Sequence, residues 1–304
     1  MDPVTHFCSG IVAKNFLTKK RDITTTIIFG LVSMSPDIDN FIGISGNPFL
    51  YLLHHRGFTH SFLGGFILAY ILYLISKMIK YSDDKLLINF YILILIHILL
   101  DVFTNYGTQV FLPFGNSRVG LNAIFIIDPI YLIILIILYF ATKRRVNTIF
   151  SSYPIIFTFI LIFTYPVMTL LIKTTYEFKL KGNNQNIIVT TAPFSPIFWK
   201  IIEDKGDNYV MYLSYKPDEK LIYKKPDKNL YEILDKEENL QIFKWFLKYP
   251  YVNIKKETNK TIYEIADLRF EFPFRQNPFI LKIIVENDNV TYIFMNYHKN
   301  LSYI

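Results

Sequence analysis

The amino-acid sequence predicts an all-α, multi-pass membrane domain followed by a small soluble α+β domain. Hydrophobic residues make up 52% of the 304 residues and aromatic residues 17%, which is high for a soluble protein. Residues 1–172 contain aspartate but no glutamate. After about residue 175, charged residues become frequent and the apolar runs shorten to the length of strands. We therefore expect a membrane-embedded domain at residues 1–172 and a soluble domain at residues 175–304.

Four apolar runs are long enough for bilayer-spanning helices, which need about 20 residues. Two shorter runs precede them, at residues 6–18 and 23–36, and each would cover only about 20 Å. We expect these two to be short or re-entrant helices inside the bundle, giving about six membrane segments. Because the chain opens with Asp2 and lacks a basic n-region, we expect no signal peptide. The long runs are residues 61–79, 86–104, 123–142 and 153–172.

Basic residues between these segments predict the orientation. If six segments cross, three basic clusters fall on one side, which the positive-inside rule makes cytoplasmic. The short connections on the other side carry only Arg56 and Arg118. We therefore expect a multi-pass protein of the cell membrane. Its C-terminal domain, and the ionisable site residues described below, should lie outside the cytoplasm. The clusters are Lys14, Lys19, Lys20 and Arg21, then Lys77, Lys80 and Lys85, then Lys143, Arg144 and Arg145.

The formal charge of +7 does not predict nucleic-acid binding, because the basic residues punctuate apolar runs instead of forming a stripe. The single cysteine, Cys8, excludes an internal disulfide framework and a thiolate metal cluster. The lone C-terminal histidine, His298, is interpreted as a surface or packing residue. No oligomeric state is indicated.

The C-terminal part has the pattern of a mixed domain. Residues 197–203 and 208–215 flank a Lys205-Gly206-Asp207 turn and are expected to form a hairpin. Residues 229–248 have helical spacing and stop before Pro250. Further strands are expected at residues 261–267, 279–286 and 290–297, the last two joined across residues 287–289.

Three of the six histidines lie within the seven residues His54-His55-Arg56-Gly57-Phe58-Thr59-His60. Neutral imidazole is the commonest metal ligand, and two imidazoles five residues apart in a turn can reach one ion. Gly57 would allow the tight backbone path of such a turn. The alternative is a polar cap on the following helix, with Thr59 or Ser61 as N-cap.

The other ionisable residues of the first domain lie at the non-cytoplasmic ends of their predicted membrane segments, or a turn or two below those ends. His97 and Asp101 are four residues apart and share one helix face. Pro36 is expected to turn Asp37 and Asp39 away from the helix axis. Because charged groups at such depth are costly unless they are paired or bind metal, a functional site is expected there. The residues at this level are His6, Asp37, Asp39, His54, His55, His60, His97, Asp101 and Asp128.

Several short motifs follow one another along the first half of the chain. They are Thr5-His6, Ser35-Pro36-Asp37-Ile38-Asp39, His55-Arg56-Gly57-Phe58-Thr59-His60-Ser61, His97-Ile98-Leu99-Leu100-Asp101, Asn105-Tyr106-Gly107-Thr108-Gln109, Pro113-Phe114 and Asp128-Pro129. This order resembles the inner-membrane metal-dependent hydrolase family often called YdjM-like, over roughly residues 1–145. The stretch from Ala192 to Trp199 is similar to what longer members carry. The resemblance implies a multi-pass membrane protein with a hydrolase site.

Imidazole and carboxylate donors suit zinc, manganese or iron, and zinc is our first choice. Two ions about 4 Å apart would activate a water and clamp the oxygens of a phosphoester. His54 is expected to cap a helix or to support a ligand. The expected ligands are Asp37, Asp39, His55, His60, His97 and Asp101, with His6 and Asp128 next, which is enough for one or two ions.

Four residues are candidates for catalysis. Arg56 and Arg118 could hold a phosphate bidentately, and surface positive charge is the alternative reading of both. Asp39 or Asp128 could act as general base where metal does not use the carboxylate fully. In addition, Asn105 and Gln109 would line the site or orient its ligands.

Two classes of function remain open. The first is a metal-dependent hydrolase that acts on a phosphoester or another ester of a lipid or lipid-linked substrate at the outer membrane face. The second is a non-enzymatic metal-binding protein, either an ion carrier or a scaffold that presents the C-terminal domain. A transporter needs polar groups near the membrane midplane, whereas these cluster at one end, which favours the enzyme.

Overall fold

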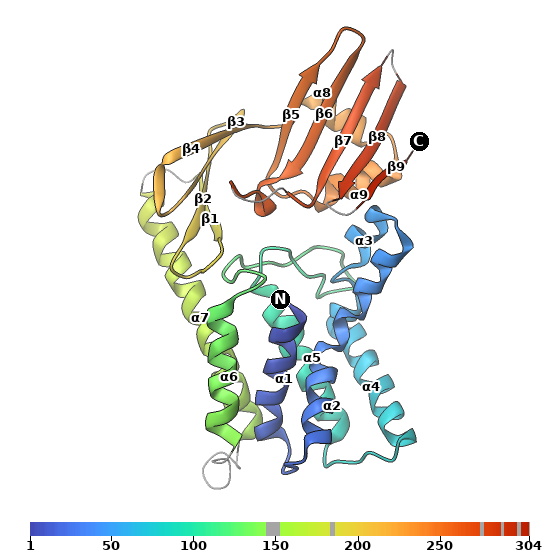
Figure 1. Cartoon of the computed structure of the whole chain (residues 1–304), viewed down its shortest axis with the longest axis vertical. Coiled ribbons are helices and arrows are strands. Elements are labelled where there is room, and N and C mark those ends of the chain that lie inside the picture. The colour runs from blue at the N-terminus through green and yellow to red at the C-terminus, as the bar shows by residue number, and fades with distance from the viewer. Residues whose placement is uncertain (144–152, 183–185, 274–276, 287–288, 297–298, 304) are drawn as a thin grey trace. The chain divides into compact units, whose positions relative to one another are not determined.

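The computed structural model describes residues 1–304 except 144–152, 183–185, 274–276, 287–288, 297–298 and 304 (Figure 1). Arg144, Arg145, the turn at residues 287–288 and His298 therefore lie outside the described residues. The chain divides into two compact units, which we call the helical unit and the sheet unit. The helical unit comprises Met1–Asn40, His55–Lys179 and Val189–Trp199, and the sheet unit comprises Phe41–His54, Leu180–Ile188 and Lys200–Ile304.

Helices of the first half begin at the capping residues that their sequences supply. Asp2 caps the first helix by accepting hydrogen bonds from two backbone N–H groups, and Asp22 and Ser61 each cap a later helix by accepting from one backbone N–H group. The elements are α1 (Pro3–Leu17), α2 (Ile23–Met34), the 3-10 helices η1 (Ser35–Ser45) and η2 (Phe58–His60), α4 (Phe62–Met78), α5 (Leu86–Val102), α6 (Pro129–Lys143) and α7 (Pro154–Lys181).

Helix α5 lies at the centre of the helical unit, where it packs against α1, α2 and α4 (Figure 1). Most of its side chains are buried, including the apolar Leu93, Ile94 and Ile98 and the ionisable His97 and Asp101. Large apolar side chains on the outer faces of α4, α6 and α7 are exposed instead. Such faces suit a lipid environment. The predicted all-helical character of this domain is confirmed.

The predicted count of about six membrane segments is not supported. Among the described residues, Ile23–Ser45 and Pro154–Lys181 are long and apolar enough to cross a membrane. Pro48–His60 and Phe62–Met78, bent by 69°, make a third if they form one broken span. The 15 residues of α6 and 17 of α5 cover only about 22 and 25 Å of a hydrocarbon core about 30 Å thick.

The sequence pattern gave the wrong helix length for one short apolar run and for one long one. The short run at residues 23–36 continues through η1 into one stretch of 23 residues. The long run at residues 123–142 loses its start, because α6 begins only at Pro129, after Asp128. Apolar composition alone does not show where a helix begins.

The sheet unit contains two antiparallel sheets, as far as the chain is described. Lys205-Gly206-Asp207 joins β2 to β3 as predicted, and the predicted strands at β6, β7 and β8 are confirmed. The predicted helix at residues 229–248 is instead two helices, α8 and α9. The strand orders are β1-β2-β3-β4 and β5-β6-β7-β8-β9. The bounds are β1 (Ile187–Thr191), β2 (Trp199–Asp204), β3 (Asn208–Leu213), β4 (Lys216–Lys224), α8 (Lys228–Leu234), α9 (Glu238–Phe246), β5 (Pro250–Lys256), β6 (Lys260–Asp267), η3 (Leu268–Phe270), β7 (Ile280–Glu286), β8 (Asn289–Asn296) and β9 (Lys299–Tyr303).

One segment of the N-terminal half belongs to the sheet unit. Residues 41–54, which we call the insert, contain α3 (Pro48–His54), and α3 packs against α9. Phe49 is fully buried, with its ring 5.8 Å from that of Tyr292 and 5.5 Å from that of Phe294. The insert lies in the sequence between Asp39 and His55, so it separates two groups of predicted site residues.

Candidate metal centre

Four donor side chains converge at one point of the helical unit. They are Asp37, His60, His97 and Asp101, whose donor atoms all lie within 4.8 Å of one another. The His60 and His97 Nε2 atoms are 3.0 Å apart, and Asp101 Oδ2 lies 3.3 Å from the first and 3.6 Å from the second. Asp37 Oδ1 lies 3.6 and 3.7 Å from the same two nitrogens. Tetrahedral zinc with bonds of about 2.0–2.2 Å needs donors about 3.3–3.6 Å apart, so the spacing fits one ion.

Three stretches of chain bring these donors together. His97 and Asp101 lie one turn apart on the buried α5, as their spacing predicts. Asp37 follows Pro36 at the start of η1, where the α-helix changes to the tighter 3-10 form. His60 ends η2, which lies so close to α4 that a Cβ on Gly64 would be 1.9 Å from the Phe58 carbonyl oxygen. Only glycine fits there.

The backbone turn before His60 differs from expectation in one detail. Arg56, not Gly57, adopts the left-handed conformation, with φ of 55°. The side chain of Arg56 is buried, and its guanidinium donates from Nη1 to Thr104 Oγ1 at 2.6 Å. These contacts fix the turn between His55 and His60.

The imidazoles are held with their Nε2 atoms toward the centre. His97 Nδ1 lies 2.8 Å from the Ser33 carbonyl oxygen, which can only accept, so Nδ1 carries the proton. His60 Nδ1 lies 2.9 Å from Asp39 Oδ2 and donates in the same way. In the neutral rings both Nε2 lone pairs then face each other across 3.0 Å. A cation between them removes that repulsion, and such hydrogen bonds behind the ring are typical of metal-binding histidines.

Asp39 lies behind the four donors. Its oxygens accept from His55 Nδ1 at 2.9 Å and from the Arg56 backbone N–H at 2.8 Å, in addition to His60. Thr59 Oγ1 donates to it as well, at 3.1 Å. Asp39 and His55, both considered as ligands from the sequence, are therefore engaged with each other beside the cluster.

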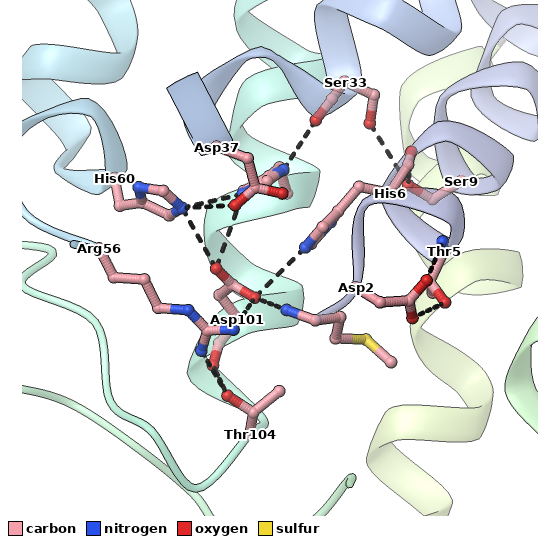
Figure 2. A network of polar contacts seen from close by, with 12 residues as sticks. Asp2, Thr5, His6, Ser9, Ser33, Asp37, Arg56, His60, Asp101 and Thr104 are labelled. Carbon is pink, nitrogen blue, oxygen red and sulfur yellow. Dashed lines mark hydrogen bonds and ion pairs between the residues drawn. The ribbon is translucent and has the colours of Figure 1, made fainter. Parts of the chain in front are cut away.

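Asp101 presents its two oxygens to different neighbours. Oδ2 faces His60 and His97, whereas Oδ1 lies 3.3 Å from His6 Nε2 and 3.1 Å from Arg56 Nη2 (Figure 2). The amino group of Met1 contacts the same Oδ1. The His6 ring stacks on that of His97 at 3.5 Å. His6 and Arg56 thus adjoin the cluster on the Oδ1 side of Asp101.

Buried charge and unpaired atoms both fit a cation at this place. Within the described part of the chain, Asp37 Oδ2, Asp101 Oδ2 and His6 Nδ1 are buried without a hydrogen-bond partner. The three carboxylates of Asp37, Asp39 and Asp101 outnumber the two basic groups that contact Asp101, the guanidinium of Arg56 and the amino group of Met1, so a net negative charge remains for a cation to balance. Buried carboxylates need such compensation.

The remaining predicted residues lie in other surroundings. Asp128 caps α6 through the backbone N–H groups of Ile130 and Tyr131, and its other oxygen accepts from Tyr165 Oη at 2.9 Å. Arg118 donates to the backbone carbonyls of Gly107 and His55. Gln109 donates through its backbone N–H to the Arg56 carbonyl, Asn105 is buried, and His54 is exposed at the end of α3.

Sequence reasoning missed Ser33 and Thr104. Ser33 acts through its backbone carbonyl, for which side-chain identity carries no signal. Thr104 lies three residues after Asp101, and its hydroxyl also donates to the Asp101 carbonyl oxygen. The polar residue one turn beyond a predicted ligand was the available sign.

Comparison with known proteins assigns the chain to a family. The model of the YdjM inner membrane protein family matches residues 1–174, more than half of the chain. The chain belongs to the YdjM inner membrane protein family. This confirms the resemblance, and with the apolar helices it identifies a membrane protein. The matched region of this YdjM family member contains all four clustered donors and ends within α7.

One curated relative aligns with about half of the chain. The chain is 29% identical over 163 residues to the uncharacterized protein YfhP of Bacillus subtilis (strain 168). The aligned part covers 52% of this chain and 49% of the relative, so the chain spans about half the length of the curated relative that it matches. No solved structure matches this YdjM family member.

Proposed function

We propose that this chain is a membrane-bound, metal-dependent hydrolase whose ion is held by Asp37, His60, His97 and Asp101. The observation that carries the proposal is the set of four converging donors with hydrogen-bonded imidazoles behind them. Zinc suits two imidazoles and two carboxylates, with manganese or iron as alternatives. Such an ion, when bound, activates water at neutral pH and withdraws charge from an ester oxygen.

The chain's own residues around the centre suit ester hydrolysis. Arg56 offers a guanidinium beside Asp101, a group that matches the paired oxygens of a phosphate. His6 has a buried Nδ1 that finds no hydrogen-bond partner in the described part of the chain, so its ring is our candidate for moving a proton. Asp39 acts as a positioning residue through the rings of His55 and His60. A phosphoester carried by a lipid is the substrate class that this set and its membrane setting favour.

The placement of basic residues supports a site at the extracytoplasmic face. Lys20 in the α1–α2 turn lies 4.6 Å over the ring of Tyr81 after α4, and Asn15 near the end of α1 bonds Thr142 near the end of α6. Lysines therefore gather at one end of these helices, while the metal donors lie at the other. The positive-inside rule makes the lysine end cytoplasmic.

A non-enzymatic metal-binding protein is the second candidate. Four protein donors around one ion are typical of structural zinc, whereas a catalytic site keeps a position for water. His60, His97 and Asp101 are fully buried, which fits a structural ion. Against this, the side chain of Asp37 is 10% exposed, whereas the other three are fully buried, which favours access from the Asp37 side.

The two candidates differ in turnover. We would load the purified protein with zinc or manganese and incubate it in mixed micelles with a panel of phospholipids and lipid-linked phosphates. We expect release of phosphate or headgroup that disappears in His60→Ala and Asp101→Ala and persists in Ile137→Ala, a control on the exposed face of α6. No turnover across the panel, with an ion that chelators remove only on unfolding, would favour the structural role.

A further inference from the structure

An apolar pocket of about 380 Å³ lies in the helical unit beside α4 and α5. Its lining is mainly aromatic, and two pairs of rings meet edge to face. Phe62 and Phe111 are 6.0 Å apart, and Phe66 and Tyr91 are 5.3 Å apart. Leu63 and Phe114 complete most of the wall. A volume of this size is at the lower end of those that bind small ligands.

The pocket is joined to the metal centre by short stretches of chain. Phe62 follows the donor His60 by two residues, and its backbone N–H donates to the Val110 carbonyl at 3.0 Å. The Tyr91 hydroxyl donates to the Phe62 carbonyl at 3.3 Å. The chain beside Val110 is also tied to the site, since the Gln109 N–H donates to the Arg56 carbonyl at 3.0 Å.

The pocket extends from the level of the donors toward the middle of the helices. On α5, Tyr91 precedes Asp101 by ten residues, which is about 15 Å along the helix axis. On α4, Phe66 lies one turn after Phe62 in the same direction, away from His60. A phospholipid has the same layout, because its phosphoester lies at the membrane surface and its acyl chains run into the hydrocarbon core.

We propose that this pocket binds one acyl chain of a phospholipid substrate and thereby brings the phosphoester to the metal centre. The inference rests on the proposed function for the identity of that substrate. Among the residues that the structure describes, the lining consists of aromatic and aliphatic side chains without a charged one, which suits a hydrocarbon chain. Arg56, beside Asp101, is placed for the phosphate. Acyl chains of the surrounding bilayer reach such a pocket without entering water.

Two matched variants separate the pocket from ordinary lipid contact. Leu63→Trp replaces an aliphatic side chain of the wall by a bulky ring, at a position that is 40% exposed, so the core need not be disturbed. Ile71→Trp makes a similar change on the exposed face of the same helix, at a position outside the pocket lining. Both variants should retain the wild-type amount of bound zinc, which is measured first.

The test is photocrosslinking in micelles with a phosphatidylglycerol that carries a diazirine in one acyl chain. We expect crosslinks at residues 62–66 and 110–114 to exceed those on α6 about tenfold. Leu63→Trp should reduce them about tenfold, the effect of removing about two methylene groups from apolar contact, and Ile71→Trp should not. An even spread over the helices, or equal labelling in Leu63→Trp, would overturn the proposal. Displacement by a polyprenyl phosphate but not by unlabelled phospholipid would overturn the acyl assignment.

The readout needs no turnover, so it separates the two proposals. Pocket-specific labelling without hydrolysis of any lipid would support the pocket and count against the hydrolase. Normal lipid hydrolysis by Leu63→Trp, with no preference for pocket residues in the wild type, would leave the hydrolase and refute the pocket.

Discussion

Replacing Phe49 by alanine tests whether the sheet unit sets the geometry of the metal centre. Phe49 is fully buried, and its ring meets those of Tyr292 and Phe294 edge to face. Removing a buried phenylalanine costs about 3–5 kcal/mol, which includes the contribution of such ring pairs. Because Phe49 anchors the insert, we expect most of this cost to appear as loosened attachment of residues 41–54.

The consequence for the metal centre follows from the order of the chain. Asp39 and His55 flank the insert, and Asp39 orients the donor His60. Loss of an orienting partner lowers metal affinity about 10- to 100-fold. Since Phe49→Ala weakens that arrangement without removing it, we expect about a tenfold loss of zinc affinity. The measurement is competition with a chromogenic chelator, below the melting temperature of the variant.

Phe270→Ala is the matched control. Phe270 in η3 is also buried and packs against Phe279 at 4.9 Å, and it lies outside both the insert and α9. It should lower the stability of the sheet unit by a comparable amount and leave zinc affinity within about twofold of wild type. Equal zinc affinities in Phe49→Ala and wild type, despite a lower melting temperature, would refute the reasoning.

Three further predictions address individual features. Asp39→Asn should lower zinc affinity about 10- to 100-fold in equilibrium dialysis but keep full stoichiometry at saturating zinc, and complete loss there would make Asp39 a ligand. Burial lowers the pKa of Lys200, whose ammonium faces three backbone carbonyls, to about 7 from 10.5, so above pH 7 the unfolded state binds more protons. Stability in urea titrations should therefore rise from pH 7 toward pH 10, and a rise of the same size in Lys200→Met would contradict this. External protease should remove the sheet unit from intact cells, whereas cleavage confined to inverted vesicles would reverse the orientation.

The sequence was enough to place His97 and Asp101 side by side, because the signal for that placement is local. His97 and Asp101 are four apart on an apolar helix, and no backbone detail beyond helical periodicity is needed to bring them to one face. For Asp39, local sequence does not decide whether the carboxylate would bind the ion or orient a histidine. A carboxylate near a metal can bind the ion or a histidine N–H, and differences of about one ångström decide between them.

Two other features were not predicted from the sequence. In one, a helix-start signal was read as a metal ligand, and in the other, the contacting residues lie far apart in the sequence. Asp128 directly before Pro129 is also a helix start signal, with aspartate at the N-cap and proline at the first helical position. The insert shows only a short apolar run, and its partner Phe294 is more than two hundred residues away in the sequence. Local periodicity holds no information on such a pairing.

The four donors divide into two pairs that depend on different parts of the fold. His97 and Asp101 are fixed by α5, whose side chains form the centre of the helical core. Asp37 and His60 lie on the two chain segments that lead into and out of the insert. The contacts between the pairs, from 3.0 to 3.7 Å, are therefore the ones that a disturbance of the insert would lengthen. Because α5 keeps its pair in place, zinc lost from Phe49→Ala should return at higher zinc concentration, whereas Asp101→Ala, which removes a donor from the fixed pair, should not recover in this way.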